Sequence, residues 1–168
     1  MLQTDSGFDV CGAESHDSVV PVLSDIVSEP IVLNLLSPNW GTWDGLLNLT
    51  QNSNSLVAAF SSADLYKYLY YTYTGPVNLN GATLTVVLSF DRAAAASSKK
   101  VAFFNTLGDS WCFVNDGLDD DDIGLDMTYS CSDFTHAAAQ GQTFKIGLVF
   151  AASAGSVTIK SATLQLAQ

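Results

Sequence analysis

TLTVVLSF, residues 83–90, is the stretch of sequence that decides the fold. Its even positions are apolar and its hydroxyl-bearing residues fall at odd positions: Leu84, Val86, Leu88 and Phe90 against Thr83, Thr85 and Ser89. Successive side chains of a β-strand point to opposite faces, so this alternation predicts a strand with one face on a core and the other toward solvent. The Asn-Gly pair at 80–81 is typical of a tight turn and marks where the strand begins.

Similar short runs, separated by turn residues, occur on both sides of this stretch. With it included, the runs are Ile31–Leu36, Leu56–Phe60, Tyr66–Thr74, Thr83–Phe90, Val101–Phe104, Trp111–Val114, Thr128–Cys131, Thr143–Phe150 and Val157–Leu166. Two Ala-rich segments, Asp91–Lys100 and Thr135–Gln140, are predicted to be loops or single turns. About nine strands are too many for one flat sheet of this length, so we predict an all-β fold, a two-sheet antiparallel β-sandwich of the jelly-roll type.

The last run changes phase along its length. Its apolar residues occupy odd positions at first (Val157, Ile159) and even positions later (Leu164, Leu166). One extra residue in the strand would bring both sets to the same face, so we predict a β-bulge near Ser161.

The chain divides into two regions of different composition. Residues 1–30 carry six acidic residues and no clear hydrophobic period, and are predicted to be an acidic linker or N-terminal arm. Residues 31–168 are predicted to form the β-sandwich domain. The length of 168 residues suits one domain, and an apolar fraction of 48% provides enough surface for a core.

The whole chain is acidic, with 17 Asp and Glu residues against 6 Lys and Arg and a net charge of −11. Phosphate backbones and anionic lipids attract proteins of the opposite sign, so neither nucleic acid nor a membrane is an expected partner. No run approaches the roughly 18 apolar residues of a membrane helix. The first residues also lack the basic and apolar regions of a signal peptide. Two interpretations remain, a cytoplasmic protein or a monomeric module excised from a longer secreted protein, and we favour the second.

Cys112 and Cys131 each lie in a strand-like run and bracket a short segment. A disulfide between them would stabilise the fold by about 3 kcal/mol on the chain-entropy model and would indicate an oxidising compartment. The alternative is that all three cysteines are buried free thiols. Cys11 has no evident partner.

Four features follow one another in the second half of the chain. They are a turn and alternating strand at residues 77–86, a strand with Trp111, an Ile-Gly-Leu core within Lys145–Phe150, and a closing Gly-Ser-Val-Thr-Ile run, Gly155–Ile159. In this order residues 31–168 resemble the jelly-roll carbohydrate-binding modules of secreted polysaccharide-degrading enzymes. The resemblance implies a non-catalytic module that binds a poly- or oligosaccharide. Such modules commonly have an Asp that helps hold a structural calcium ion directly after the Ile of the last strand, and here Lys160 stands at that position.

Six aromatic residues are candidates for sugar contacts, because Trp and Tyr combine an apolar ring with a polar group and tolerate partial exposure. They are Trp40, Trp43, Tyr66, Tyr68, Tyr70 and Trp111. The alternative for each is packing in the core. The three tyrosines share one face of a predicted strand, but the opposite face, with Leu69, Tyr71 and Tyr73, is also apolar, and the pattern leaves open which row enters the core. Trp40 and Trp43 lie in a Gly-containing loop and are predicted to be exposed at a rim.

A dense group of carboxylates lies between Asn115 and Asp126. Calcium takes roughly six to eight oxygen ligands, which suits such a segment, although the spacing does not fit an EF-hand. We predict a structural Ca2+ site here, with a solvated acidic hairpin tip as the alternative. The candidate ligands are Asp116, Asp119, Asp121 and Asp126.

Few features favour catalysis. Both Glu residues lie in the N-terminal arm and both histidines, His16 and His136, stand alone, so the sequence indicates neither a catalytic pair of Glu residues nor a His-rich metal centre. We therefore expect this domain not to be an enzyme. The alternatives are a structural or adhesive jelly roll, such as a viral coat, spike or surface-assembly domain, and a hydrolase of unrecognised type.

Overall fold

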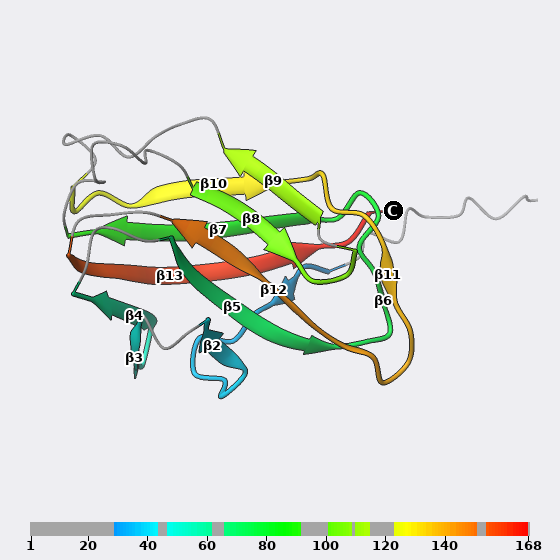
Figure 1. The fold of residues 1–168 in the computed structure, drawn as a ribbon, viewed down its shortest axis with the longest axis horizontal. Helices are drawn as coiled ribbons and strands as arrows, with labels where there is room; N and C mark the ends of the chain where they lie inside the picture. Colours follow the sequence, from blue (N-terminus) through cyan, green and yellow to red (C-terminus); the bar gives the residue numbers. More distant parts are fainter. Residues whose placement is uncertain are drawn as a thin grey trace, which may run out of the picture.

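A computed structural model describes residues 29–43, 47–61, 66–91, 101–108, 110–114, 123–150 and 154–167. These residues form strands and turns, and no helix occurs among them (Figure 1). The part of the chain so described therefore contains no helix that could span a membrane. The prediction of an all-β fold is confirmed.

Six strands form an antiparallel sheet, called sheet A. They are β1 (Ile31–Val32), β3 (Asn48–Asn52), β4 (Ser55–Phe60), β7 (Thr83–Phe90), β10 (Met127–Cys131) and β13 (Gly155–Gln165). The order across the sheet is β10-β7-β13-β4-β3, and β1 pairs with the C-terminal part of β13. The alternation of β7 is the predicted one, because its four even-numbered residues are buried and its odd-numbered residues are half-buried.

Five strands form a second antiparallel sheet, called sheet B. They are β2 (Trp40–Thr42), β5 (Lys67–Thr74), β8 (Val101–Asn105), β9 (Ser110–Val114) and β12 (Thr143–Phe150). The order is β2-β5-β12-β8-β9, so β12 is the central strand. In Figure 1 the strands of sheet B run obliquely across β7 and β13 of sheet A.

A small third sheet pairs β6 (Val77–Asn78) with β11 (Ala137–Ala138). These two strands, together with β2 and β3, were not among the predicted strands, because they are too short or too exposed to show an apolar alternation. The first predicted strand is shorter than expected. After Val32 the chain turns, and the side-chain Oδ1 of Asn34 accepts a hydrogen bond from the N–H of Leu36 at 2.9 Å.

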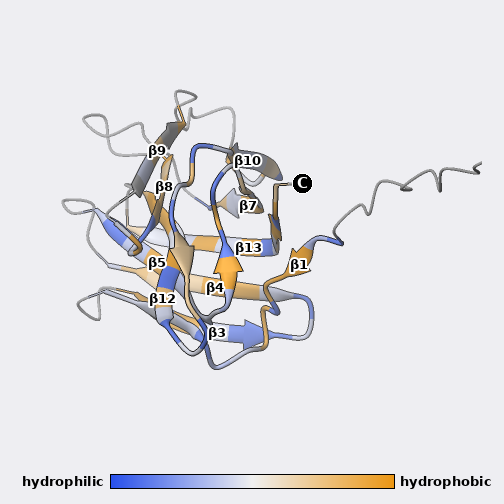
Figure 2. Ribbon diagram, turned by 90° about the vertical axis from the view of Figure 1, so that its right-hand side faces the viewer, coloured by the Kyte–Doolittle hydropathy of each residue, from blue (hydrophilic) through white to orange (hydrophobic). Residues whose placement is uncertain are grey.

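The two large sheets pack face to face over one hydrophobic core. Figure 2 shows the layers from the side, with β8 and β9 on the left of β7 and β10. The ring of Phe150 in sheet B joins the layers, because its centroid lies 5.7 Å from that of Phe60 and 5.5 Å from that of Phe90, both in sheet A. The predicted two-sheet sandwich is confirmed.

The predicted bulge lies in β13. Ile159 is opposite Leu88 and Ser161 is opposite Val87, so Lys160 is the extra residue. Ile159 before the bulge and Leu164 after it are both fully buried. The bulge therefore keeps both halves of the strand directed at the core.

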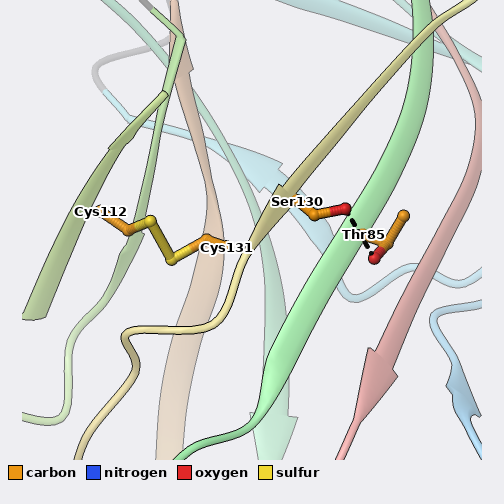
Figure 3. Close-up of a disulfide and its surroundings, with 4 residues drawn as sticks. All are labelled: Thr85, Cys112, Ser130 and Cys131. Carbon is orange, nitrogen blue, oxygen red and sulfur yellow. Dashed lines mark hydrogen bonds between the residues drawn. A yellow bond between two sulfur atoms is a disulfide. The ribbon is translucent and has the colours of Figure 1, made fainter. Parts of the chain in front are cut away.

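A disulfide joins Cys112 to Cys131, the pair that the sequence singled out. Cys112 lies in β9 at the edge of sheet B and Cys131 in β10 at the edge of sheet A, so the bridge ties the two sheets together (Figure 3). Beside it, the hydroxyls of Ser130 and Thr85 share a hydrogen bond of 3.1 Å that links β10 to β7.

Candidate functional site

The outer face of sheet B carries a group of aromatic side chains, called the aromatic patch: Trp43, Tyr68, Tyr70, Phe104 and Trp111. The orientation of the side chains in β5 shows which of them belong to the aromatic patch. Leu69 is fully buried and Tyr71 and Tyr73 pack against the core, so the odd-numbered row faces inward. Tyr68 and Tyr70 therefore face outward, which settles the choice that the sequence left open.

Trp43 covers one side of the patch. The chain leaves β2 after Thr42, and the indole lies across sheet B, with ring centroids 5.5 Å from Tyr68, 5.7 Å from Tyr70 and 5.6 Å from Phe104. Phe104 belongs to β8, on the far side of the central strand from β5. Even with these contacts, 36% of the Trp43 surface remains exposed.

Trp111 covers the other side, from the edge strand β9. Its ring lies 5.6 Å from Phe104 and 6.3 Å from Tyr68, and 42% of its surface is exposed. Phe104 is only 2% exposed, so it forms the floor on which both indoles rest. Two half-exposed indoles thus stand on one buried ring.

Two glycines make room for this packing. Gly147 in β12 pairs with Tyr70 on one side and with Phe104 on the other, and a Cβ there would collide with the carbonyl oxygen of Leu69. Gly41 in β2 pairs with Tyr70, and a Cβ at that position would lie 2.8 Å from the tyrosine ring. A side chain at either position would therefore collide with β5, the strand that carries Tyr70.

Lys145 adds a positive charge to the patch. Its Nζ lies 4.1 Å from the ring centroid of Tyr70 and 4.6 Å from that of Trp43, within the range of a cation–π interaction. The backbone around it is fixed by Thr106, whose N–H donates to the carbonyl of Lys145 and whose Oγ1 accepts from its N–H, both at 2.9 Å. No carboxylate of the described residues pairs with Lys145.

This arrangement suits a flat ligand with apolar faces and a polar rim. The indoles offer apolar plates, while the phenol groups of Tyr68 and Tyr70 and the ammonium of Lys145 offer hydrogen bonds beside them. A pyranose ring has that shape and chemistry, with C–H groups on its faces and hydroxyls around its edge.

Four of the six predicted aromatic contacts lie together in the patch: Trp43, Tyr68, Tyr70 and Trp111. Tyr66 is 55% exposed just before β5, and none of the described ring contacts includes it. The prediction that Trp40 is exposed is wrong. It is 7% exposed, since it pairs with Tyr71 of the inward row, packs edge-to-face on that ring at 5.3 Å and donates its Nε1–H to the carbonyl of Asn34 at 3.0 Å.

Sequence reasoning missed Phe104 and Lys145. β8 is apolar at nearly every position, so nothing in its pattern marks Phe104 as part of an outer face. For Lys145 a signal existed, because the apolar residues Phe144, Ile146, Leu148 and Phe150 occupy alternate positions of the strand and so share one face. The residue between the first two of these had to point the other way.

Of the four predicted metal ligands, Asp126 alone lies among the residues that the structure describes. Asp116, Asp119 and Asp121 lie outside the described residues, so a calcium site there stays a prediction. The carboxylate of Asp126 is 2.5 Å from the ammonium of Lys160, and this ion pair does not suit a calcium ligand because the cation would have to displace Lys160. Within the described ranges, no group of three or more His, Cys, Asp or Glu residues could hold a metal ion.

No family model and no curated protein matches the chain. Among solved structures, it is similar to the xylan-binding module CBM15, with a TM-score of 0.61 and 20% identity over 83% of this chain and 97% of that one. It is also similar to a mutant xylanase from Cellvibrio japonicus in complex with xylopentaose, with a TM-score of 0.57 and 18% identity over 82% of this chain and 29% of the xylanase.

A third similar structure is the C-terminal family 22 carbohydrate-binding module of a Clostridium thermocellum protein. Its TM-score is 0.55, with 14% identity over 84% of this chain and 93% of that module. At these identities the likeness concerns the fold. The chain has the jelly-roll fold of carbohydrate-binding modules.

Proposed function

We propose that this chain is a non-catalytic carbohydrate-binding module that holds a poly- or oligosaccharide on its aromatic patch. The observation that carries the proposal is the pair of half-exposed indoles, Trp43 and Trp111, standing on one sheet face above Phe104. Large exposed aromatic rings gathered on one face of a folded domain are characteristic of a binding surface.

The spacing of the indoles fits a chain of sugars. Each centroid is 5.6 Å from that of Phe104, so the two indoles are separated by at most twice this distance. Sugars close to one another along one oligosaccharide could therefore contact Trp43 and Trp111 together. The central strand lies between them without a side chain at Gly147, which leaves the patch open across the sheet.

Xylan is the first polymer to test, because two of the similar structures are named for xylan-binding or for a complex with xylopentaose. The Cys112–Cys131 disulfide supports a secreted protein, since such bridges persist in oxidising compartments. We infer that the module is part of a longer secreted protein that acts on polysaccharides.

Affinity gel electrophoresis against a panel of polysaccharides, followed by calorimetry with oligosaccharides of the retained polymer, tests the proposal. Trp43→Ala and Trp111→Ala are each expected to weaken binding about tenfold or more, because each removes a central contact ring. Both variants should stay folded, with melting temperatures within about 4 °C of the native chain. Leu36→Ala, an exposed apolar truncation in the turn after β1, is the control and should bind normally.

The contrary result would be a protein that migrates past every polysaccharide unretarded and elutes as a defined oligomer. That outcome would favour a structural or adhesive domain. Full binding by both tryptophan variants would place the sugar somewhere other than the aromatic patch.

A further inference from the structure

We propose that the aromatic patch selects a neutral sugar chain that carries an isolated carboxylate, as in a uronic acid side group, and that Lys145 binds this carboxylate. The inference rests on the proposed function and adds the chemical class of the ligand. The observation behind it is the position of Lys145, a positively charged side chain in an acidic molecule.

The charges of the chain are distributed unevenly. The net charge is −11, and three of the six Lys and Arg residues lie in the described part: Lys67, Lys145 and Lys160. Lys67 is 1% exposed on the inner side of β5, and Lys160 is paired with Asp126. Lys145 is thus the one of these three that is both accessible and without a carboxylate from the described residues, and it lies on the aromatic patch.

The surroundings of Lys145 favour an anionic ligand. Its ammonium lies over the rings of Tyr70 and Trp43, which remove part of its water without neutralising its charge. A hydrogen bond from such an ammonium to a carboxylate is stronger than one to a neutral hydroxyl. A sugar stacked on Trp43 would bring its substituents close to this Nζ, which is 4.6 Å from the ring centroid.

Lys145 is also held at a fixed place. It belongs to β12, the central strand of sheet B, and both of its backbone polar groups are bonded to Thr106. A charge on a central strand is positioned more precisely than one on a loop, which is what discrimination between similar ligands requires.

The net charge decides how many carboxylates the ligand can carry. A polymer with a charge on every sugar would meet repulsion from a protein whose net charge is −11, with each charge screened over a Debye length of about 8 Å at physiological salt. One carboxylate on a neutral backbone gains the contact with Lys145 and presents little further charge. The structure therefore favours a sparsely charged glycan over a polyuronate.

The test uses a matched pair of ligands. The first is a xylose oligosaccharide with one glucuronic acid side group, and the second is the same oligosaccharide after chemical reduction of its carboxyl group to an alcohol. Calorimetry with the native chain should show about fivefold tighter binding of the acidic form. Lys145→Gln should bind the two ligands equally, while Lys145→Arg should retain the preference for the acidic form.

Lys160→Gln is the matched control, because it removes the same charge from sheet A and should leave the preference intact. Equal binding of the two ligands by the native chain, or a preference that survives in Lys145→Gln, would overturn the inference and leave the proposed function standing. Binding of neither ligand would overturn it as well. In that case affinity gel electrophoresis against the polysaccharide panel tests the proposed function separately. Retention of the protein by any other polymer would support the proposed function.

Discussion

Trp40 and Trp43 are three positions apart in the same short segment, yet one is buried against Tyr71 and the other lies on the outer face. The difference comes from the pairing of β2 with β5, which places Trp40 opposite an inward residue. Whether an aromatic ring is exposed therefore depends on the register in which its strand pairs with the neighbouring strand.

Trp40→Ala should cost stability and spare sugar binding. Removing this buried ring leaves a cavity and deletes the hydrogen bond that the indole donates to the Asn34 carbonyl, a loss of about 3–5 kcal/mol in the free energy of unfolding. Urea denaturation measures the loss, and calorimetry well below the melting temperature measures the affinity of the folded fraction. Native stability together with abolished binding would show that Trp40 belongs to the site after all.

Candidate site residues could be predicted from the sequence by type, but only partly by place. Tyr68 and Tyr70 alternate with a row that is equally apolar, so the strand pattern could not choose between the two faces. Phe104 is buried among apolar neighbours, and its role as the floor depends on Trp43, which reaches it from a segment distant in sequence. Contacts between strands decide the site, and a single sequence does not show them.

At the scale of strands, the sequence was more informative. The alternation in β7 and the change of phase in β13 each predicted a structural feature. A shift of one residue in a strand with one buried face would turn its apolar side chains to solvent, so the apolar pattern must match the structure. β3 and β11 escaped prediction because exposed or very short strands carry no such constraint. Strands with a buried face can therefore be predicted from the sequence, and exposed or very short strands cannot.

Two single-residue deletions in β13 should therefore behave differently. Deleting Lys160 removes the extra residue and still leaves Ile159 and Ala162 facing the core, so the cost should be about 1 kcal/mol, including the exposed pair with Asp126. Deleting Thr163 turns Leu164 away from the core and should cost about 2 kcal/mol or more.

Thermal melts followed by circular dichroism compare the two deletion variants directly. The deletion at Thr163 is the control for the general effect of shortening the strand. A larger loss from the deletion of Lys160 would contradict the assignment of that residue as the bulge.

For the whole molecule, the bridge between Cys112 and Cys131 is the covalent link across the sandwich. It closes a loop of 19 residues, and its loss should lower the free energy of unfolding by about 3 kcal/mol. Melting with and without a thiol reductant, in a Cys11→Ser background that excludes the third cysteine, measures the effect. An identical melt under both conditions would show that the bridge does not form in solution.

The same bridge also anchors the strand that carries Trp111. In sheet B, β9 is an edge strand that pairs with β8 alone, and Cys112 directly follows the indole. Opening the bridge therefore removes a constraint on β9 and Trp111. The affinity for the glycan should fall before the rest of the sandwich unfolds. Thermodynamic reciprocity then acts in the opposite direction: a glycan that holds Trp111 in place must protect the sulfur–sulfur bond from thiols by the same factor. Protein saturated with its glycan should need more dithiothreitol for half-reduction than empty protein.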